Sequence, residues 1–339
     1  MPTIRIADTS TSFECMSDDT IARAALRAGI GMPYECNVGA CGTCKMELVD
    51  GHIDTAWPAA PALSDRDRTK NRVLGCQAHP VEDCTIKVRT ADQYLPTFRP
   101  RRFLGTLAST KDITHDIREF HVQTADCLPF RPGQYALLSL PGVAGQRAYS
   151  MSNVTTREDA AVWQFQIKRV PAGQGTTVLF DRLRPGDQIG IDGPFGSAYL
   201  REECPRDLVC ISGGSGISPM LSIARAMMRS PTMVSRKLHF FYGGRTRRDI
   251  CGEAELRELP GFGERLFYHP SLSMAMPEED AKWTGHVGFV HENVLPTIGG
   301  NPPEYEYYFA GPPAMAQATQ RLLMQHKVPL TQMHFDQFY

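Results

Sequence analysis

The chain has 339 residues, a length that predicts two or three domains. Hydrophobic residues make up 42% and charged residues 22%, as in ordinary globular proteins, and the net charge of −1 argues against a general nucleic-acid binder. No stretch approaches the roughly 20 apolar residues that span a bilayer, and no signal core follows Met1, so we expect a cytoplasmic protein without a membrane partner.

The first domain, expected over residues 1–95, has the pattern of a small α+β unit. Its predicted elements are a hairpin (Ile4–Ala7, Thr11–Met16), a helix over Thr20–Ala28 capped by Asp18 or Asp19 and ended by Gly29, a strand Lys45–Val49 before the turn Asp50-Gly51, a helix near Ser64–Asn71 and a strand Cys84–Arg89.

Four cysteines in this domain carry the strongest signal. Cys36, Cys41, Cys44 and Cys76 follow the C-x4-C-x2-C…C spacing of a plant-type [2Fe-2S] ferredoxin. Structural zinc sites usually combine two close-spaced pairs of ligands, whereas here three ligands crowd one loop and the fourth is distant. The pattern therefore favours four iron ligands in a surface loop that a partner can approach, and a site that moves single electrons.

Six further cysteines are scattered through the chain. A disulfide framework is typical of short secreted chains, so we expect reduced, buried thiols at Cys15, Cys84, Cys127, Cys204, Cys210 and Cys251.

A proline-containing linker over Ala91–Arg101 leads to a second domain, expected over residues 99–204. Short alternating strands separated by turn signals predict an antiparallel β-barrel, with strands at Phe103–Ala108, Asp116–Gln123, Gln134–Leu140, Val162–Lys168 and Gln188–Ile191.

Two motifs in the barrel suit a phosphate-bearing, flat cofactor. After a strand comes Arg147-Ala148-Tyr149-Ser150, which offers a guanidinium fork, an aromatic ring and a hydroxyl. A glycine-rich turn, with Gly173, Gly175, Thr176 and Thr177, precedes a short helix predicted over Val178–Leu183 and presents backbone N–H groups. Either motif alone is a weak signal, and an Arg-x-Tyr-Ser tetrapeptide is more often a plain strand; together, at this spacing, they favour a cofactor site.

The third domain, expected over residues 205–339, alternates strands and helices, as in a parallel sheet covered by helices. The predicted elements are Leu208–Ile211, Ile217–Met228, Lys237–Tyr242, Arg265–Tyr268, Tyr307–Ala310 and Ala314–His326. Gly213, Gly214 and Gly216 form a turn between the first strand and the first helix, a geometry that suits a pyrophosphate as well as an ordinary α/β connection. The strand ends at Gly243 and Gly311-Pro312 should reach the same sheet edge.

With these motifs, the whole chain resembles the NADH-dependent reductase components of bacterial multicomponent oxygenases, most of all those of soluble diiron monooxygenases. The segments that carry the resemblance are Pro33–Asn37, Trp57–Leu63, Arg147–Ser150 and His334–Phe338, while Thr114–Arg118 and Gln164–Ile167 look closer to reductases of Rieske dioxygenases. The resemblance implies a ferredoxin domain, an FAD-binding barrel and an NAD-binding α/β domain.

The resemblance also implies site residues. Those assigned to FAD are Arg147, Tyr149, Ser150, Gly173, Gly175, Thr176 and Thr177; those assigned to the nicotinamide nucleotide are Gly213, Gly214, Gly216, Arg245, Gly311 and Pro312. Lys168 is expected to bind a cofactor, without a choice between the two. Phe338 and Tyr339 stand where relatives place an aromatic ring over the flavin, although a hydrophobic C-terminal plug is the alternative. Tyr149, Ser150 and Tyr339 would lie at the reacting rings. Ala310 departs from the cysteine of many relatives, so no thiol role in hydride transfer is carried over.

The residues alone do not decide between NADH and NADPH, nor between the two kinds of oxygenase partner. Arg245, Arg247 and Arg248 would suit a 2′-phosphate or simply form a solvated loop, and Asp249 is the one obvious acidic candidate for a ribose; the family favours NADH. The implied function passes electrons from NADH through FAD and a [2Fe-2S] cluster to an oxygenase or hydroxylase component or its ferredoxin. We expect a monomer serving a diiron hydroxylase, with a Rieske dioxygenase reductase as the alternative and a redox sensor as the rival from another class.

Overall fold

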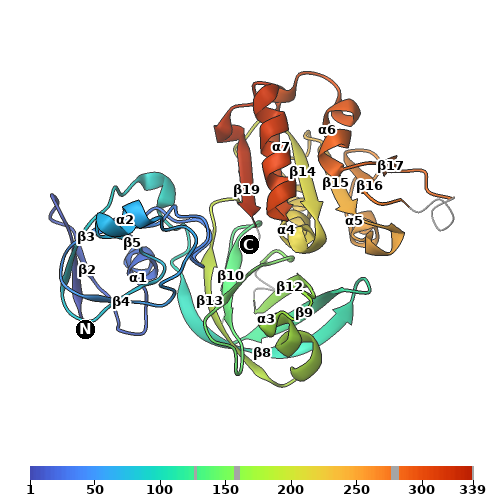
Figure 1. Cartoon of the computed structure of the whole chain (residues 1–339). Coiled ribbons are helices and arrows are strands. Elements are labelled where there is room, and N and C mark those ends of the chain that lie inside the picture. The colour runs from blue at the N-terminus through green and yellow to red at the C-terminus, as the bar shows by residue number, and fades with distance from the viewer. Residues whose placement is uncertain (126–127, 156–160, 276–281, 338–339) are drawn as a thin grey trace. The chain divides into compact units, whose positions relative to one another are not determined.

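The computed structural model describes residues 1–125, 128–155, 161–275 and 282–337 (Figure 1). The chain forms two compact units. The first consists of Met1–Phe103, Ala136–Ala148 and Gly190–Ser197, and the second of Leu104–Tyr135, Tyr149–Ile189 and Ala198–Tyr339. The first unit therefore contains the cysteine-rich domain together with two segments of the central sheet.

The cysteine-rich part of the first unit is built on a five-stranded sheet in the order β2-β1-β7-β3-β5. Strand β1 pairs with β7 in parallel, whereas the β1–β2, β3–β5 and β3–β7 pairs are antiparallel. Its elements are β1 (Thr3–Ile6), β2 (Ser12–Glu14), α1 (Ile21–Arg27), β3 (Lys45–Asp50), β4 (Ile53–Thr55), α2 (Asp65–Thr69), β5 (Arg72–Leu74), β6 (Ala78–Pro80) and β7 (Cys84–Lys87), with a 3-10 turn at Asp92–Tyr94. The predicted hairpin, helices and strands of this domain are all present.

Helix α1 ends as predicted but begins differently. Gly29, with φ of 80°, takes the left-handed conformation that ends many helices. The cap prediction was wrong: Thr20 occupies the N-cap without a side-chain cap bond. The Asp19 carboxylate instead accepts the Thr20 N–H at 2.8 Å and the Arg27 Nε–H at 2.8 Å, because an ion pair competes for the oxygen that a cap would use.

The central strands form one six-stranded sheet in the order β11-β10-β13-β8-β9-β12, and the unit boundaries run through β10, β11 and β13. The elements are β8 (Arg101–Asp112), β9 (Ile117–Thr124), β10 (Tyr135–Ser139), β11 (Arg147–Ser150), β12 (Val162–Lys168), α3 (Gln174–Thr177) and β13 (Gln188–Phe195). Two predictions need correction. The Arg147–Ser150 motif is itself a strand, and the short helix starts four residues early as α3, continuing into a π-helical turn at Val178–Arg182.

The last domain holds a six-stranded sheet in the order β17-β16-β15-β14-β18-β19, with every pair parallel. Its elements are β14 (Asp207–Gly213), α4 (Ile217–Arg229), β15 (Leu238–Gly244), α5 (Glu253–Arg257), β16 (Leu266–Leu272), β17 (His286–Val287), α6 (Val290–Ile298), β18 (Tyr305–Gly311), α7 (Pro313–Gln325) and β19 (Met333–Gln337). The six predicted elements are confirmed. The prediction omitted α5, α6, β17 and β19, which are short or interrupted by Pro296.

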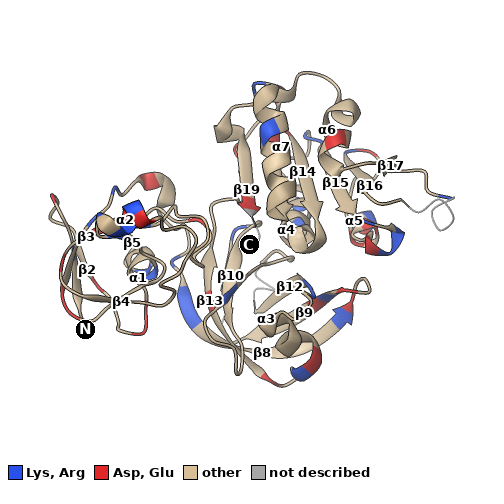
Figure 2. Ribbon diagram, viewed as in Figure 1, with Lys and Arg blue, Asp and Glu red and all other residues tan. Residues whose placement is uncertain are grey.

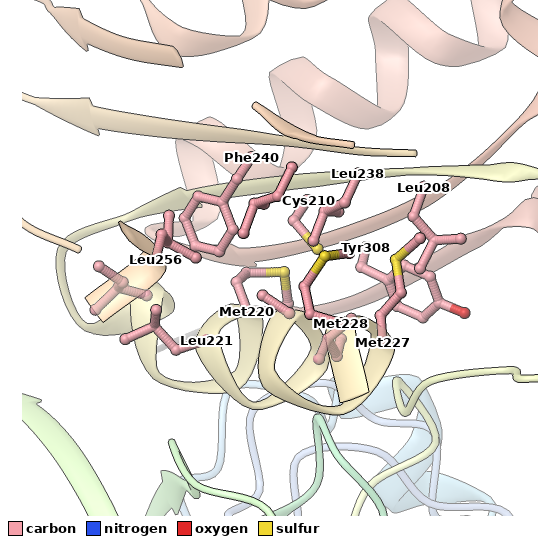
Figure 3. Close-up of a cluster of buried hydrophobic side chains, with 14 of the residues drawn as sticks. Leu208, Cys210, Met220, Leu221, Met227, Met228, Leu238, Phe240, Leu256 and Tyr308 are labelled. Carbon is pink, nitrogen blue, oxygen red and sulfur yellow. The ribbon is translucent and has the colours of Figure 1, made fainter. Parts of the chain in front are cut away.

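Both faces of this sheet are covered because the side chains of a strand alternate between its faces. Leu208 and Cys210 of β14 belong to the core against α4, where Met220, Leu221, Met227 and Met228 pack with Leu238, Phe240 and Tyr308 (Figure 3). Val209 and Ile211 join the opposite core with side chains of α6 and α7. Burial on both faces explains the continuous apolar run in β14.

Figure 2 shows Lys and Arg interspersed with Asp and Glu along the ribbon, consistent with the near-zero net charge. Within the described ranges, none of the helices has the length and apolar character needed to cross a lipid bilayer.

The α4 core yields a stability prediction. Leu221→Ala should destabilise the protein by about 2–5 kcal/mol, because removing this fully buried side chain leaves a cavity in the core that includes α4. The matched change Leu330→Ala, at a side chain that is 59% exposed, should stay within about 0.5 kcal/mol. Urea unfolding followed by circular dichroism measures both; equal effects would contradict the packing described.

Candidate functional site

The four cysteines predicted as iron ligands come together in two pairs within the first unit. The Cys41 thiol hydrogen-bonds to Cys36, and the Cys44 thiol hydrogen-bonds to Cys76. Cys44 and Cys76 are buried, whereas Cys36 and Cys41 are partly exposed. Two irons that share four thiolates need such a two-by-two arrangement, so these residues fit the cluster.

The loop backbone explains how the pairs form. Gly39 and Gly42 have φ of 88° and 81°, a left-handed conformation that glycine adopts without steric cost. These turns direct amides at sulfur: the Cys41 N–H lies 3.4 Å from Cys36 Sγ and the Thr43 N–H 3.5 Å from Cys41 Sγ. Such bonds stabilise negative charge on sulfur.

The distant ligand is drawn in by a backbone contact. The Gly75 N–H donates to the Cys44 carbonyl at 2.9 Å, which sets Cys76 beside Cys44. The Gln77 side-chain amide lies 3.6 Å from Cys76 Sγ and adds a donor that the sequence did not single out. The position of Gln77, directly after the fourth cysteine, was the signal in the sequence that could have indicated this contact.

Within each thiol pair the two pKa values shift in opposite directions. The bond from Cys41 lowers the pKa of Cys36 to about 6, while the same bond, with burial, raises the pKa of Cys41. In the second pair the Cys44 bond lowers the pKa of Cys76, and the pKa of Cys44 rises. Iron binding would displace the remaining thiol protons, because cysteine ligates metals as the thiolate.

The other described cysteines are free and buried, as predicted: Cys15, Cys84, Cys204, Cys210 and Cys251. Burial raises the pKa of each of these thiols, to about 12 for Cys15 and Cys251. They pack as small hydrophobes. Cys127 lies outside the described residues.

The Arg147–Ser150 motif lies on β11, with Tyr149 half-buried and Ser150 buried. The Arg147 Nη1 donates to the carbonyls of Ala144 and Gln146 at 3.2 and 3.1 Å. These bonds fix the guanidinium stem beside the strand, where its remaining donors can meet an anion.

The glycine-rich turn holds its shape through Thr176. The Thr176 hydroxyl contacts the N–H and the carbonyl of Val170, both at 3.2 Å, and the carbonyl of Gly173. A Cβ on Gly173 would lie 2.8 Å from this hydroxyl, so the turn requires a residue without a side chain. Because the hydroxyl is used within the turn, the backbone amides around Gly175 are the groups that suit a pyrophosphate.

Three parallel strand ends meet at one edge of the last sheet. In the strand register Gly213 of β14 pairs with Gly243 of β15, and Ser212 pairs with Ala310 of β18. A Cβ on Gly216 would lie 2.0 Å from the Ala310 carbonyl oxygen, and one on Gly311 would lie 3.0 Å from that of Gly213. The edge is therefore a glycine-lined cradle in which backbone can approach a nucleotide closely.

Lys168 lies next to this cradle. A Cβ on Gly214 would meet its stem at 3.3 Å, and its ammonium lies 2.9 Å from the Asp116 carboxylate and 4.0 Å from that of Asp249. His115 approaches the same two carboxylates at 3.5 and 3.8 Å. The Lys168 ammonium already supplies a cation to this cluster, so we interpret it as an ion-pair network that positions Lys168.

The arginines after β15 point to solvent. Arg245, Arg247 and Arg248 are exposed. The Asp249 carboxylate instead accepts hydrogen bonds from the backbone N–H and the hydroxyl of Thr246, at 2.8 and 3.0 Å. Asp249 is thus engaged in a turn rather than available to a ribose.

Sequence reasoning missed a polar face of α4. Ser218 Oγ donates to the Ser150 carbonyl at 2.7 Å, Ser222 Oγ to that of Asn153 at 2.6 Å, and Arg225 to that of Ser152 at 2.7 Å. Three polar residues at helical spacing on an otherwise apolar helix were the available signal. These bonds fasten the segment after the Arg147–Ser150 motif to the last domain. Phe338 and Tyr339 lie outside the described residues.

Comparison with known proteins assigns all three domains. Residues 4–81 match the family model of the 2Fe-2S iron-sulfur cluster binding domain, 105–199 that of the oxidoreductase FAD-binding domain, and 210–321 that of the oxidoreductase NAD-binding domain.

The chain is similar over its whole length to several curated proteins. It is 39% identical to ferredoxin--NAD(P)(+) reductase CarAd of Metapseudomonas resinovorans, with 96% of each chain covered. It is 36% identical to the ferredoxin--NAD(+) reductase component of the alkene monooxygenase system of Xanthobacter autotrophicus, with 96% of this chain and 98% of the other covered. A solved structure of the ferredoxin reductase in carbazole 1,9a-dioxygenase matches with a TM-score of 0.91 at 34% identity, covering 100% and 98% of the two chains. The chain therefore belongs to the family of [2Fe-2S]- and FAD-containing ferredoxin–NAD(P)(+) reductase components of oxygenase systems.

Proposed function

We propose that this protein oxidises NADH and delivers single electrons to the hydroxylase component of a diiron monooxygenase. The observation that carries the proposal is the two-by-two pairing of Cys36 with Cys41 and of Cys44 with Cys76, in a chain whose other domains bind FAD and NAD. NADH gives up two electrons together as a hydride, whereas a [2Fe-2S] cluster accepts one electron. Bound FAD would accept both electrons and allow their release one at a time. The half-exposed Cys36 and Cys41 loop is the side of the cluster that a partner would approach.

The proposed flavin and nucleotide roles come from the sequence resemblance and are supported by the positions of the described motifs. Arg147 and the amides of the 173–177 turn would hold the FAD phosphates, Tyr149 and Ser150 would contact its ring, and Phe338 and Tyr339 would cover it. The 213–216 turn, Gly311 and Pro312 would bind the nicotinamide nucleotide, with Lys168 and Arg245 at its charged part. Tyr149, Ser150 and Tyr339 have no proton to carry in hydride transfer, so their task is to position the two rings and exclude water.

The domains proposed are residues 1–95 for the cluster, 99–204 for FAD and 205–339 for NAD. The nine described cysteines are all free, which suits the reducing cytoplasm. A monomer remains the expected state.

A dioxygenase partner is the second candidate. The structural match at TM-score 0.91 is to a reductase in carbazole 1,9a-dioxygenase, while the relatives include alkene, phenol and propane monooxygenase reductases. The monooxygenase proposal is supported by the larger share of these names.

The function is tested by turnover with each class of partner. Purified holoprotein should reduce ferricyanide with NADH and support substrate oxidation by a purified diiron hydroxylase. Support of a Rieske oxygenase alone would favour the second candidate, and flavin content without any NADH turnover would overturn the reductase proposal.

The fourth iron ligand is tested by Cys76→Ser. The variant should lose the cluster absorbance while NADH still bleaches the flavin, because FAD and NAD bind to other domains. Cys84→Ser, at a buried thiol outside the loop, is the control and should keep the spectrum. Unchanged cluster absorbance in the Cys76 variant would refute its ligand role.

The nucleotide preference is tested by steady-state kinetics. We expect a higher kcat/KM with NADH than with NADPH. Arg245→Ala should lower kcat/KM more for NADPH than for NADH, since the 2′-phosphate adds a negative charge that the exposed guanidinium can contact. Arg257→Ala, an exposed arginine paired with Glu253, is the control. A preference for NADPH in the unmodified protein would contradict the assignment.

A further inference from the structure

Two buried aspartates and three arginines form an ion-pair network beside the fourth cysteine in the first unit. The Arg27 guanidinium contacts both oxygens of Asp192, at 2.7 and 2.8 Å, and reaches Asp19 at 2.8 Å. Arg102 contacts Asp19 at 2.7 Å and lies 3.8 Å from Asp192. Arg23, one helical turn before Arg27 on α1, lies 3.8 Å from Asp192.

The contacts in this network are shared unequally among the three arginines. Two carboxylates are buried, with side chains only 1% (Asp192) and 5% (Asp19) exposed. Arg102 is 32% exposed and also pairs with the exposed Asp18, so water screens this pair. Arg27 makes short contacts to both buried carboxylates, whereas Arg23 lies 3.8 Å from Asp192 and is the less well paired of the two.

Arg23 is the arginine of this network that contacts one of the proposed iron-ligand residues. Its side chain is 11% exposed, its Nη2 lies 3.4 Å from the Cys76 carbonyl and its Nη1 contacts the Gln146 side chain. Its buried Nε finds no hydrogen-bond acceptor in the described part of the chain. A buried guanidinium with an unused donor is costly unless a nearby negative charge compensates it.

We propose that Arg23 is the counter-charge of the [2Fe-2S] cluster and raises its reduction potential. The inference rests on the proposed function, which places the cluster on Cys36, Cys41, Cys44 and Cys76. Four thiolates around two irons and two sulfides carry net negative charge, and reduction adds one electron without breaking a bond or requiring a proton. A fixed cation close by favours the more negative, reduced form, and burial makes the effect stronger than it would be in water.

Arg23 would act through charge and not by contact with a reacting atom, so it is a positioning and tuning residue. Two residues of the central sheet region contact the Arg23 guanidinium: Gln146, directly before β11, and Asp192, in β13. The position of Arg23 therefore depends on the central sheet as well as on the cysteine-rich domain. A purely structural role would make the same contacts without affecting the potential.

Variants that change the charge of the network in opposite directions distinguish a role in tuning the potential from a purely structural role. Arg23→Gln should lower the equilibrium constant for one-electron reduction of the cluster at least tenfold, which corresponds to 59 mV for a one-electron couple. Asp192→Asn, which removes a negative charge from the same network, should move it in the opposite direction. Arg23→Lys should retain most of the unmodified value, and Arg5→Gln, at a surface arginine 57% exposed, should change it less than twofold.

The measurement is an anaerobic redox titration of each holoprotein, followed by cluster absorbance and electron paramagnetic resonance, with and without added salt. The buried-charge shift should survive salt because the Debye screening that weakens surface charges hardly reaches it. Equal potentials in the Arg23→Gln and unmodified proteins, or a shift of the same sign in Asp192→Asn, would overturn the proposal.

Failure of the proposed function and failure of the Arg23 proposal give different results. If Arg23→Gln does not retain iron, Asp192→Asn and Arg23→Lys still decide the sign and the charge dependence. If the unmodified protein forms no cluster at all, the proposed function fails; if the cluster forms and its potential ignores these charges, only the role of Arg23 fails.

Discussion

The cluster site depends on one chain reversal, the fold of the loop that brings Cys41 back to Cys36 and Cys44 to Cys76. Gly39 and Gly42 make the reversal through left-handed backbone, and the Gly75–Cys44 hydrogen bond closes it from the far side. Without it, four thiols at this spacing would be ordinary reduced cysteines, like Cys15 or Cys210. The backbone amides aimed at sulfur show a site shaped for thiolates rather than for neutral thiols.

A second constraint appears at the edge of the NAD-binding sheet. Parallel strands β14, β15 and β18 bring their glycine-rich ends together, and the contact between Gly216 and the Ala310 carbonyl leaves no room for a side chain. The cysteine loop and the sheet edge share one feature: in both, glycine lets backbone N–H groups come close to a charged group. Arg23, whose side chain is only 11% exposed and contacts the Cys76 carbonyl, adds a full charge to these backbone dipoles.

Much of this could be predicted because the decisive signals are local. The cysteine spacing, the strand–turn–helix pattern at 209–220 and the alternation of the barrel strands all lie within short stretches. What could not be predicted depends on distant partners. The prediction that Asp19 caps the helix was wrong, since the Asp19 carboxylate pairs with Arg27. The sequence also does not indicate that the hydroxyls of Ser218 and Ser222 donate to carbonyls nearly 70 residues away. The pairing of Arg27 with Asp192, 165 residues apart, has no local pattern at all.

Anaerobic titration of the holoprotein with NADH tests the central claim most directly. A hydride carries two electrons, FAD stores two and the cluster one, so full reduction should require about 1.5 NADH per chain and end with both chromophores bleached and a reduced-cluster resonance signal. A titration that ends at about one NADH per chain, with the flavin bleached and the cluster still oxidised under strongly reducing conditions, would contradict electron relay between the two groups.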